Sequence, residues 1–184
     1  MTLFAIRKGE RRDVWAAFFT LFALIGSHSL LETARDALFL ARVPATRLPW
    51  VYLAIAVCSF GLVKAQALVA QSGSAERRLA GMALFAAAGT FGFFWLFSRL
   101  GTLGLYALYT WSGLLATLLL AHFWALIADR FTITQGKRLY GFIGAGSVLG
   151  AIVGSGAAGL AASVMAPQRL LLVAAIGFTV ASGM

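Results

Sequence analysis

Charged residues are scarce in this sequence of 184 residues: Asp, Glu, Lys and Arg make up 11% of the chain, and only six residues are acidic. A soluble domain of ordinary composition is about 25% charged. Cysteine occurs once and histidine twice, which permits neither an intramolecular disulfide nor a Cys/His metal cluster. We therefore expect no metal site and no cofactor. Nor does any nucleophile–base pair outside the first apolar segment indicate an enzyme.

Apolar residues are abundant instead, at 61% of the chain, and the mean hydropathy is +0.89. A compact fold of this size has too much surface to hide so many apolar side chains from water, which excludes a soluble enzyme. A disordered chain is excluded by the same composition. The sequence therefore predicts a polytopic membrane protein whose main partner is the lipid bilayer. A net charge of +9 would suggest nucleic acid in a soluble domain, but the basic residues lie mainly in short loops, so we expect no nucleic-acid partner.

Six apolar segments are long enough, or nearly so, to cross a hydrocarbon core about 30 Å thick as helices. They predict an all-α, six-transmembrane-helix bundle over residues 15–184, preceded by a basic cytoplasmic segment over 1–14. The segments span residues 15–40, 49–70, 79–97, 103–128, 139–164 and 170–184. The last segment is still apolar at Met184, so we interpret it as truncated and the chain as a fragment.

The distribution of lysine and arginine predicts the orientation of the bundle. With the N-terminus inside, nine basic residues fall on the cytoplasmic side: Arg7, Lys8, Arg11, Arg12, Arg77, Arg78, Arg130, Lys137 and Arg138. Four fall outside: Arg42, Arg47, Arg99 and Arg169. Cytoplasmic loops carry the excess of positive charge in membrane proteins. We therefore predict a multi-pass protein of the inner (plasma) membrane with its N-terminus in the cytoplasm.

Four polar residues on the first segment are the candidate substrate-binding residues: His28, Glu32, Arg35 and Asp36. At about 100° per residue they occupy an arc of roughly 100° on one helix face. Charges within a bilayer cost several kcal/mol, so they normally face a bundle interior or an aqueous cavity. We predict that this stripe lines a cavity and binds an anionic small molecule, because the guanidinium fork of Arg35 suits a carboxylate or phosphate.

A structural interpretation of the stripe also stays open. Glu32, Arg35 and Asp36 have the spacing to neutralise one another and to hold the helix end at the outer membrane interface. The nearby Arg42 and Arg47 would then mark the membrane boundary.

The segment over 139–164 is rich in glycine. Gly146, Gly150 and Gly154 recur every four residues and so share one helix face. Small residues at this spacing allow two membrane helices to approach closely. We predict that these glycines pack against a neighbouring helix.

Several strings in the sequence resemble the ATP/ADP translocase family of the major facilitator superfamily, in its distant bacterial-type form. They are LLETARDALF at 30–39, LPW at 48–50, FWALIADRF at 123–131 and GKRLYGFIGAG at 136–146. In order and spacing they are similar to that family over about residues 15–160. The resemblance implies the N-terminal half of a transporter, paired with a C-terminal six-helix half that is missing here.

The resemblance further implies exchange of ATP for ADP, or movement of a related nucleotide or organic anion, by alternating access. Arg35 stands where the family has a phosphate-contacting lysine, and Asp36 matches the acidic neighbour of that lysine. Two positions depart from the family pattern, because Ser112 replaces an expected acidic residue and Tyr52 lies near an expected basic one. These departures keep a different organic anion open as the substrate.

Two further hypotheses concern function. Lys137 and Arg138, paired with Asp129 or Glu76, form a possible gate at the cytoplasmic mouth, or they serve only as topology charges. From another functional class, the bundle is a non-transporting membrane anchor or sensory module for a soluble domain absent from this fragment.

Overall fold

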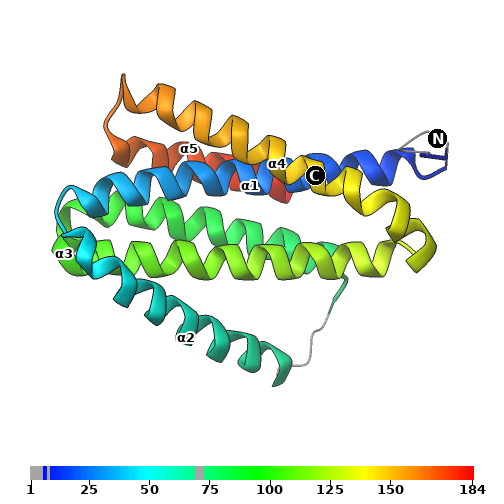
Figure 1. Cartoon of the computed structure of the whole chain (residues 1–184), viewed down its shortest axis with the longest axis horizontal. Helices are drawn as coiled ribbons and strands as arrows, with labels where there is room; N and C mark the ends of the chain where they lie inside the picture. The colour runs from blue at the N-terminus through cyan, green and yellow to red at the C-terminus, as the bar shows by residue number, and fades with distance from the viewer. Residues whose placement is uncertain (1–5, 8, 69–72) are drawn as a thin grey trace.

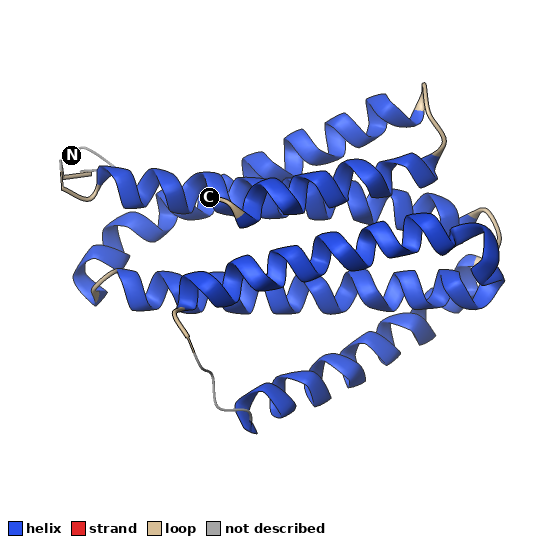
Figure 2. Cartoon of the chain, turned by 180° about the vertical axis from the view of Figure 1, so that it is seen from behind, coloured by secondary structure: helices blue, strands red, loops and turns tan. Residues whose placement is uncertain are grey.

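The computed structural model describes residues 6–7, 9–68 and 73–184, and in these residues every regular element is a helix (Figure 2). The predicted all-α fold is confirmed. The elements are α1 (Arg11–Leu40), the short 3-10 helix η1 (Ala45–Arg47), α2 (Leu48–Leu68), α3 (Ala75–Arg130), α4 (Ile133–Ala162) and α5 (Pro167–Ser182).

The long element α3 is two membrane-length arms joined at a glycine. Gly101 has φ 54° and ψ −150°, a backbone conformation that only glycine adopts readily. The first arm (residues 75–100) and the second arm (residues 102–130) run side by side in opposite directions (Figure 1). Trp111 joins the arms, because its ring centroid lies 5.0 Å from that of Phe85 and 6.0 Å from that of Phe93. Two of the predicted segments are therefore separated by a single break.

Within the described residues, five helical stretches have the length and apolar composition needed to cross a membrane: Arg11–Leu40, Ala45–Gln66, Ala75–Phe97, Gly101–Arg130 and Ile133–Ala162. The sixth, α5, is apolar but has only 16 residues. These helices indicate a multi-pass membrane protein.

Helix boundaries differ most from the predicted ranges where polar residues cap a helix outside its apolar part. The Ser74 hydroxyl accepts a hydrogen bond from the Arg77 amide, so α3 begins at residue 75 instead of 79. A reciprocal capping box between Thr132 and Gln135 starts α4 at residue 133 instead of 139. Hydropathy alone places both starts too late, because the first turns contain charged or polar residues.

Helix α1 lies at the centre of the bundle and packs against α3, α4 and α5. Its buried side chains Leu21, Leu24 and Leu31 share one apolar core with Phe123 of α3 and Phe178 of α5. Helix α2 diverges from this core at one end (Figure 1). Only its first turns contact α3, and most of its large apolar side chains are exposed.

The contact between α1 and α4 depends on the absence of side chains at three glycines. A β-carbon added at Gly146, Gly150 or Gly154 would collide with the backbone carbonyl oxygen of Phe18, Phe22 or Gly26, respectively. The structure therefore places all three glycines at a helix–helix contact, and α4 lies against the α1 backbone itself.

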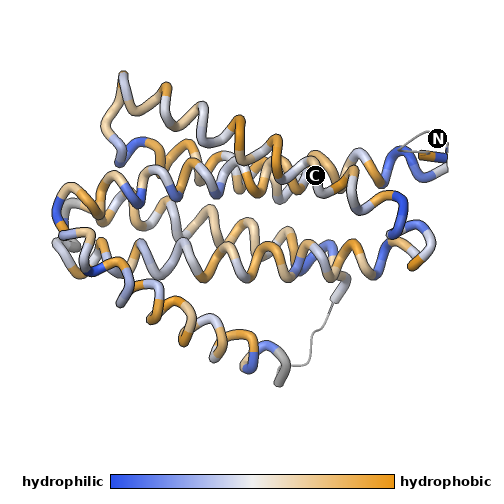
Figure 3. Tube along the Cα trace, in the orientation of Figure 1, coloured by the Kyte–Doolittle hydropathy of each residue, from blue (hydrophilic) through white to orange (hydrophobic). Residues whose placement is uncertain are grey.

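Hydrophilic residues are concentrated toward the two ends of the bundle, and the middle of the helices consists mainly of hydrophobic residues (Figure 3). One end contains the start of α1, the start of α3 and the turn between α3 and α4. The other end contains the α1–α2 link, the turn between the two arms of α3 and the α4–α5 link (Figure 1). The two groups of basic residues assigned from the sequence to opposite membrane sides lie at these opposite ends. Lys8, one of the cytoplasmic group, lies outside the described residues.

Candidate functional site

Arg35 lies at the centre of a polar cluster where α1 meets the second arm of α3. Its side chain is only 6% exposed. Its Nε donates to Asp36 Oδ1 at 2.9 Å, and its Nη1 donates to Ser112 Oγ at 2.7 Å. Glu32 Oε1 lies 3.5 Å from the same Nη1. A buried guanidinium requires such partners, since an unpaired charge in an apolar environment is costly.

Tyrosine rings complete the environment of Arg35. The guanidinium carbon lies 4.0 Å from the ring centroid of Tyr109, in a cation–π arrangement. The hydroxyl groups of Tyr109 and Tyr52 are 3.0 Å apart and share a hydrogen bond. This contact connects the start of α2 to the cluster, so three helical segments converge on Arg35.

His28 belongs to the same cluster, although it lies two turns before Arg35. Its Nε2 is 3.0 Å from the carbonyl oxygen of Ser112, and its Nδ1 is 3.6 Å from Glu32 Oε2. Glu32 therefore contacts His28 with one carboxylate oxygen and Arg35 with the other. The predicted stripe is thus connected through its own side chains and through Ser112.

The two carboxylates of the cluster are much more accessible than Arg35 and His28. The Glu32 and Asp36 side chains are 45% and 46% exposed, whereas His28 is 9% exposed. Beside His28 and Glu32 lies a cavity of about 290 Å³ between α1, the second arm of α3 and α4. Apolar side chains such as Leu119 and Leu120 form most of its wall. The cluster therefore combines a covered cationic centre with acidic groups that water can reach.

Of the seven residues in the cluster, four are site residues predicted from the sequence and the other three are not. The two positions noted as departures from the family pattern, Ser112 and Tyr52, both lie in the cluster around Arg35. Tyr109 was not predicted, because an aromatic residue in an apolar helix is ordinary. Its position one turn before Ser112 is the signal that would have identified it.

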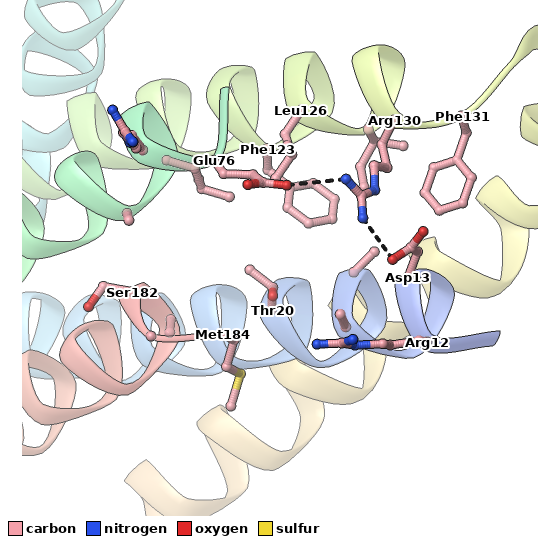
Figure 4. A pocket seen from close by; sticks show the side chains of 18 residues that line it. Arg12, Asp13, Thr20, Glu76, Phe123, Leu126, Arg130, Phe131, Ser182 and Met184 are labelled. Atoms are coloured by element: carbon pink, nitrogen blue, oxygen red, sulfur yellow. Dashed lines mark hydrogen bonds and ion pairs between the residues drawn. The ribbon is translucent and has the colours of Figure 1, made fainter. Parts of the chain in front are cut away.

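A second polar region lies at the basic end of the bundle, beside a cavity of about 560 Å³. Arg130 at the end of α3 lies between two carboxylates (Figure 4). Its Nη2 is 3.0 Å from Asp13 Oδ1, and its Nη1 is 3.4 Å from Glu76 Oε1. The starts of α1 and α3 are thereby joined to the end of the second arm.

The predicted gate residues have different partners from those expected. Arg138 binds Glu10, with Nη2 2.7 Å from Oε2, and Glu76 binds Arg130 instead. No ion pair within residues 6–7, 9–68 and 73–184 involves Asp129 or Lys137, and both side chains are exposed. The expected pairing is corrected because the capping box at Thr132 turns α4 so that Arg138 faces the start of α1.

Glu10 also receives a hydrogen bond at 2.9 Å from Nε2 of Gln135. This bond is the main reason that the pKa of Glu10 lies below its ordinary value, and the contact with Arg138 lowers the pKa further. The carboxylate is therefore held in its ionised form at the basic end of the bundle.

In the part of the chain that the structure describes, no three His, Cys, Asp or Glu side chains are arranged to hold a metal ion. Comparison of the chain with models of known protein families, with curated proteins and with solved structures yields no match. The resemblance to the ATP/ADP translocase family therefore stays a prediction from the sequence.

Proposed function

We propose that this chain is the N-terminal half of a secondary active transporter for an anionic small molecule. The proposed substrates are ATP and ADP in exchange, or a related nucleotide or organic anion. The bundle would work with a second six-helix half, and the two halves would expose the site alternately to each side of the membrane.

The observation that carries this proposal is the arrangement of Arg35. Its guanidinium is nearly covered by protein, and its Nε and Nη1 are engaged by Asp36, Ser112 and Glu32. Its Nη2 has no hydrogen-bond partner within the described ranges. A fixed, charged donor with one unused nitrogen suits an incoming phosphate or carboxylate oxygen.

The exposed carboxylates support an exchange mechanism. Glu32 and Asp36 neutralise Arg35 when no anion is bound, which lowers the cost of keeping a charge inside the membrane. An anion would replace part of this contact, and the freed carboxylate would turn toward water. Arg35 would then have a counter-charge in both the empty and the loaded state.

The alternative, a non-transporting anchor or sensory module, rests on the same ion pairs. Since two carboxylates within α1 can offset the charge of Arg35, the cluster is also suited to fixing α1 against α3. Under this alternative the cluster has no ligand, and substitution of Arg35 lowers stability only.

The test is uptake of labelled ATP into ADP-loaded proteoliposomes that contain the complete gene product. Arg35→Ala is compared with Arg42→Ala, an exposed arginine whose guanidinium lies 5.3 Å from the Phe97 ring. We expect saturable uptake that requires internal ADP, is lost in Arg35→Ala and persists in Arg42→Ala. Full transport by folded Arg35→Ala protein would show that the cluster is structural.

A further inference from the structure

Both ring nitrogens of His28 face oxygen atoms that accept hydrogen bonds. Nε2 is 3.0 Å from the backbone carbonyl of Ser112, which can only accept, so Nε2 carries a hydrogen. Nδ1 is 3.6 Å from a carboxylate oxygen of Glu32. A neutral imidazole has one N–H, so its unprotonated Nδ1 would direct a lone pair at a carboxylate. If one proton is added to Nδ1, the imidazolium of His28 and the carboxylate of Glu32 form an ion pair.

Of the acidic groups in the described residues, only Glu32 contacts His28, and it also contacts Arg35. Asp36, the next carboxylate along α1, binds Arg35 Nε. Because the guanidinium of Arg35 lies 3.5 Å from Glu32 and favours an ionised carboxylate, we place the added proton on His28.

Among the described residues, the other helices bring no competing charge to His28. From α3, the Tyr109 ring lies against the guanidinium of Arg35, and from α2, the Tyr52 hydroxyl shares a hydrogen bond with that of Tyr109. The remaining residues of α3 and α4 that line the cavity beside His28 are apolar: Ala116, Leu119, Leu120 and Ala151. From α5, Gly177 packs against Ser27. Within the part of the chain that the structure describes, the charge of His28 is therefore governed by Glu32 and Arg35.

The cavity beside the pair gives a proton a route to it. Its volume of about 290 Å³ is enough for several water molecules, each of which occupies about 30 Å³ in the liquid. His28 and Glu32 form the polar part of its wall together with Ser29. The half-exposed carboxylate and the nearly buried ring both border this cavity, so a water molecule bound there would reach both groups.

We infer that His28 and Glu32 form a proton-binding site, and that this proton travels with the anion held at Arg35. The inference rests on the proposed transport function and names its coupling ion. With the proton bound, the two cations and two carboxylates of the stripe sum to zero charge, and Glu32 is shared between His28 and Arg35. Without it the stripe carries one negative charge, and Glu32 competes with the anion for Arg35 alone. Proton and anion therefore favour each other's binding, and this linkage is reciprocal.

The first arm of the test measures the proton directly by ¹⁵N NMR of histidine-labelled full-length protein in lipid nanodiscs. The signals of His28 are identified as those that disappear in His28→Gln, and His122, the other histidine of this chain, serves as an internal control because its Nδ1 lies 2.9 Å from the carbonyl oxygen of Leu118. We expect both nitrogens of His28 to carry protons at pH 6, and one of them to lose its proton in Glu32→Gln. The His122 signals should be the same in both proteins. A neutral His28 in the wild-type protein at pH 6 would overturn the inference.

The second arm measures labelled ATP uptake into ADP-loaded proteoliposomes at external pH 6 and pH 8. Coupling to one proton permits a change of up to about ten-fold per pH unit. We expect uptake to be higher at pH 6 in the wild-type protein and independent of pH in His28→Gln. Glutamine retains a donor for the Ser112 carbonyl, and His122→Gln is the matched control that should keep the pH dependence.

The two arms separate the possible failures. Uptake that is equally dependent on pH in His28→Gln overturns the coupling but leaves the proposed transport function intact. A protonated His28 in a protein that takes up no ATP at either pH overturns the proposed exchange of ATP and ADP, and the coupling of the proton to that exchange with it. Transport that is independent of pH in the wild-type protein overturns the inference alone.

Discussion

At the residue scale, the cluster depends on the shape of the Arg35 side chain as well as on its charge. The guanidinium makes three contacts: Nε donates to Asp36, Nη1 donates to Ser112, and the planar face lies on the ring of Tyr109. A lysine at this position would supply only a point charge on a flexible stem. The planar group therefore links α1 to α3 in a way that a lysine cannot reproduce.

We expect Arg35→Lys to bind the transported anion less well, although the net charge of the site is unchanged. The KM of uptake should rise roughly ten-fold, which corresponds to about 1.4 kcal/mol. Arg42→Lys, far from the cluster, should leave the KM unchanged. Equal KM values for the wild-type and Arg35→Lys proteins would mean that only the charge of residue 35 matters.

The charged members of the cluster could be predicted from the sequence because charged residues are rare in its apolar segments. Arg35, Glu32 and Asp36 were identifiable because charged residues seldom occur in an apolar segment. The neutral residues that contact these charged groups could not be predicted in the same way. Tyrosine and serine, the residue types of Tyr109 and Ser112, are common in membrane helices. Their role depends on how the second arm of α3 lies against α1, which the sequence of one helix does not specify.

At the element scale, the contact between α1 and α4 is set by glycines that admit the backbone of the neighbouring helix. Gly154→Ala should destabilise the bundle, because the new β-carbon meets the carbonyl oxygen of Gly26, and a backbone atom cannot move aside cheaply. Overpacking of this kind costs about 1–3 kcal/mol. Gly156→Ala, two residues along the same helix, meets nothing within 4 Å and should be tolerated. The measurement is the thermal midpoint of each purified protein in detergent, and equal midpoints would contradict this packing.

A second prediction concerns the contact of Glu10 with Gln135 and Arg138 at the start of α4. Because the folded-state pKa of Glu10 lies below its ordinary value of 4.5, the contact contributes stability above pH 4.5. This contribution is lost as the pH falls through the folded-state pKa. Wild-type protein should therefore melt at a higher temperature than Glu10→Gln at pH 7, and the difference should shrink as the pH is lowered below 4.5.

Glu76→Gln is the matched control for this experiment, since Glu76 is an acidic residue at the same end with a looser contact to Arg130 at 3.4 Å. Its effect at pH 7 should be smaller, as exposed ion pairs contribute little. A larger effect for Glu76→Gln than for Glu10→Gln would show that the contact of Arg138 does not hold α4 to α1.

The number and order of the helices could be predicted from the hydropathy of the sequence, but the positions of the helix N-caps could not. The apolar segments mark only the part of each helix that suits the hydrocarbon core, so the polar first turns of α3 and α4 fell outside the predicted ranges. The break at Gly101 lies within the predicted gap between 97 and 103, where the apolar pattern pauses.

At the scale of the whole molecule, the two ends of the bundle differ in basic charge. Among the described residues, eight basic ones belong to the end that contains the start of α1: Arg7, Arg11, Arg12, Arg77, Arg78, Arg130, Lys137 and Arg138. The opposite end has four: Arg42, Arg47, Arg99 and Arg169. Since lysine and arginine near helix ends are retained on the cytoplasmic side, the N-terminal end should face the cytoplasm.

Single cysteines introduced into a Cys58→Ser background test this orientation. Thr46 and Ser163 are exposed at the end with fewer basic residues, and Thr134 is exposed in the first turn of α4 at the other end. A membrane-impermeant maleimide applied to intact cells should label Thr46→Cys and Ser163→Cys but reach Thr134→Cys only after permeabilisation. The reverse pattern would place the N-terminus outside. It would also put the contacts of Glu10 and Arg130 on the external side of the membrane. These contacts could then take no part in a gate on the cytoplasmic side. Labelling of Thr46→Cys and Ser163→Cys from opposite sides would contradict the antiparallel arrangement of the helices itself.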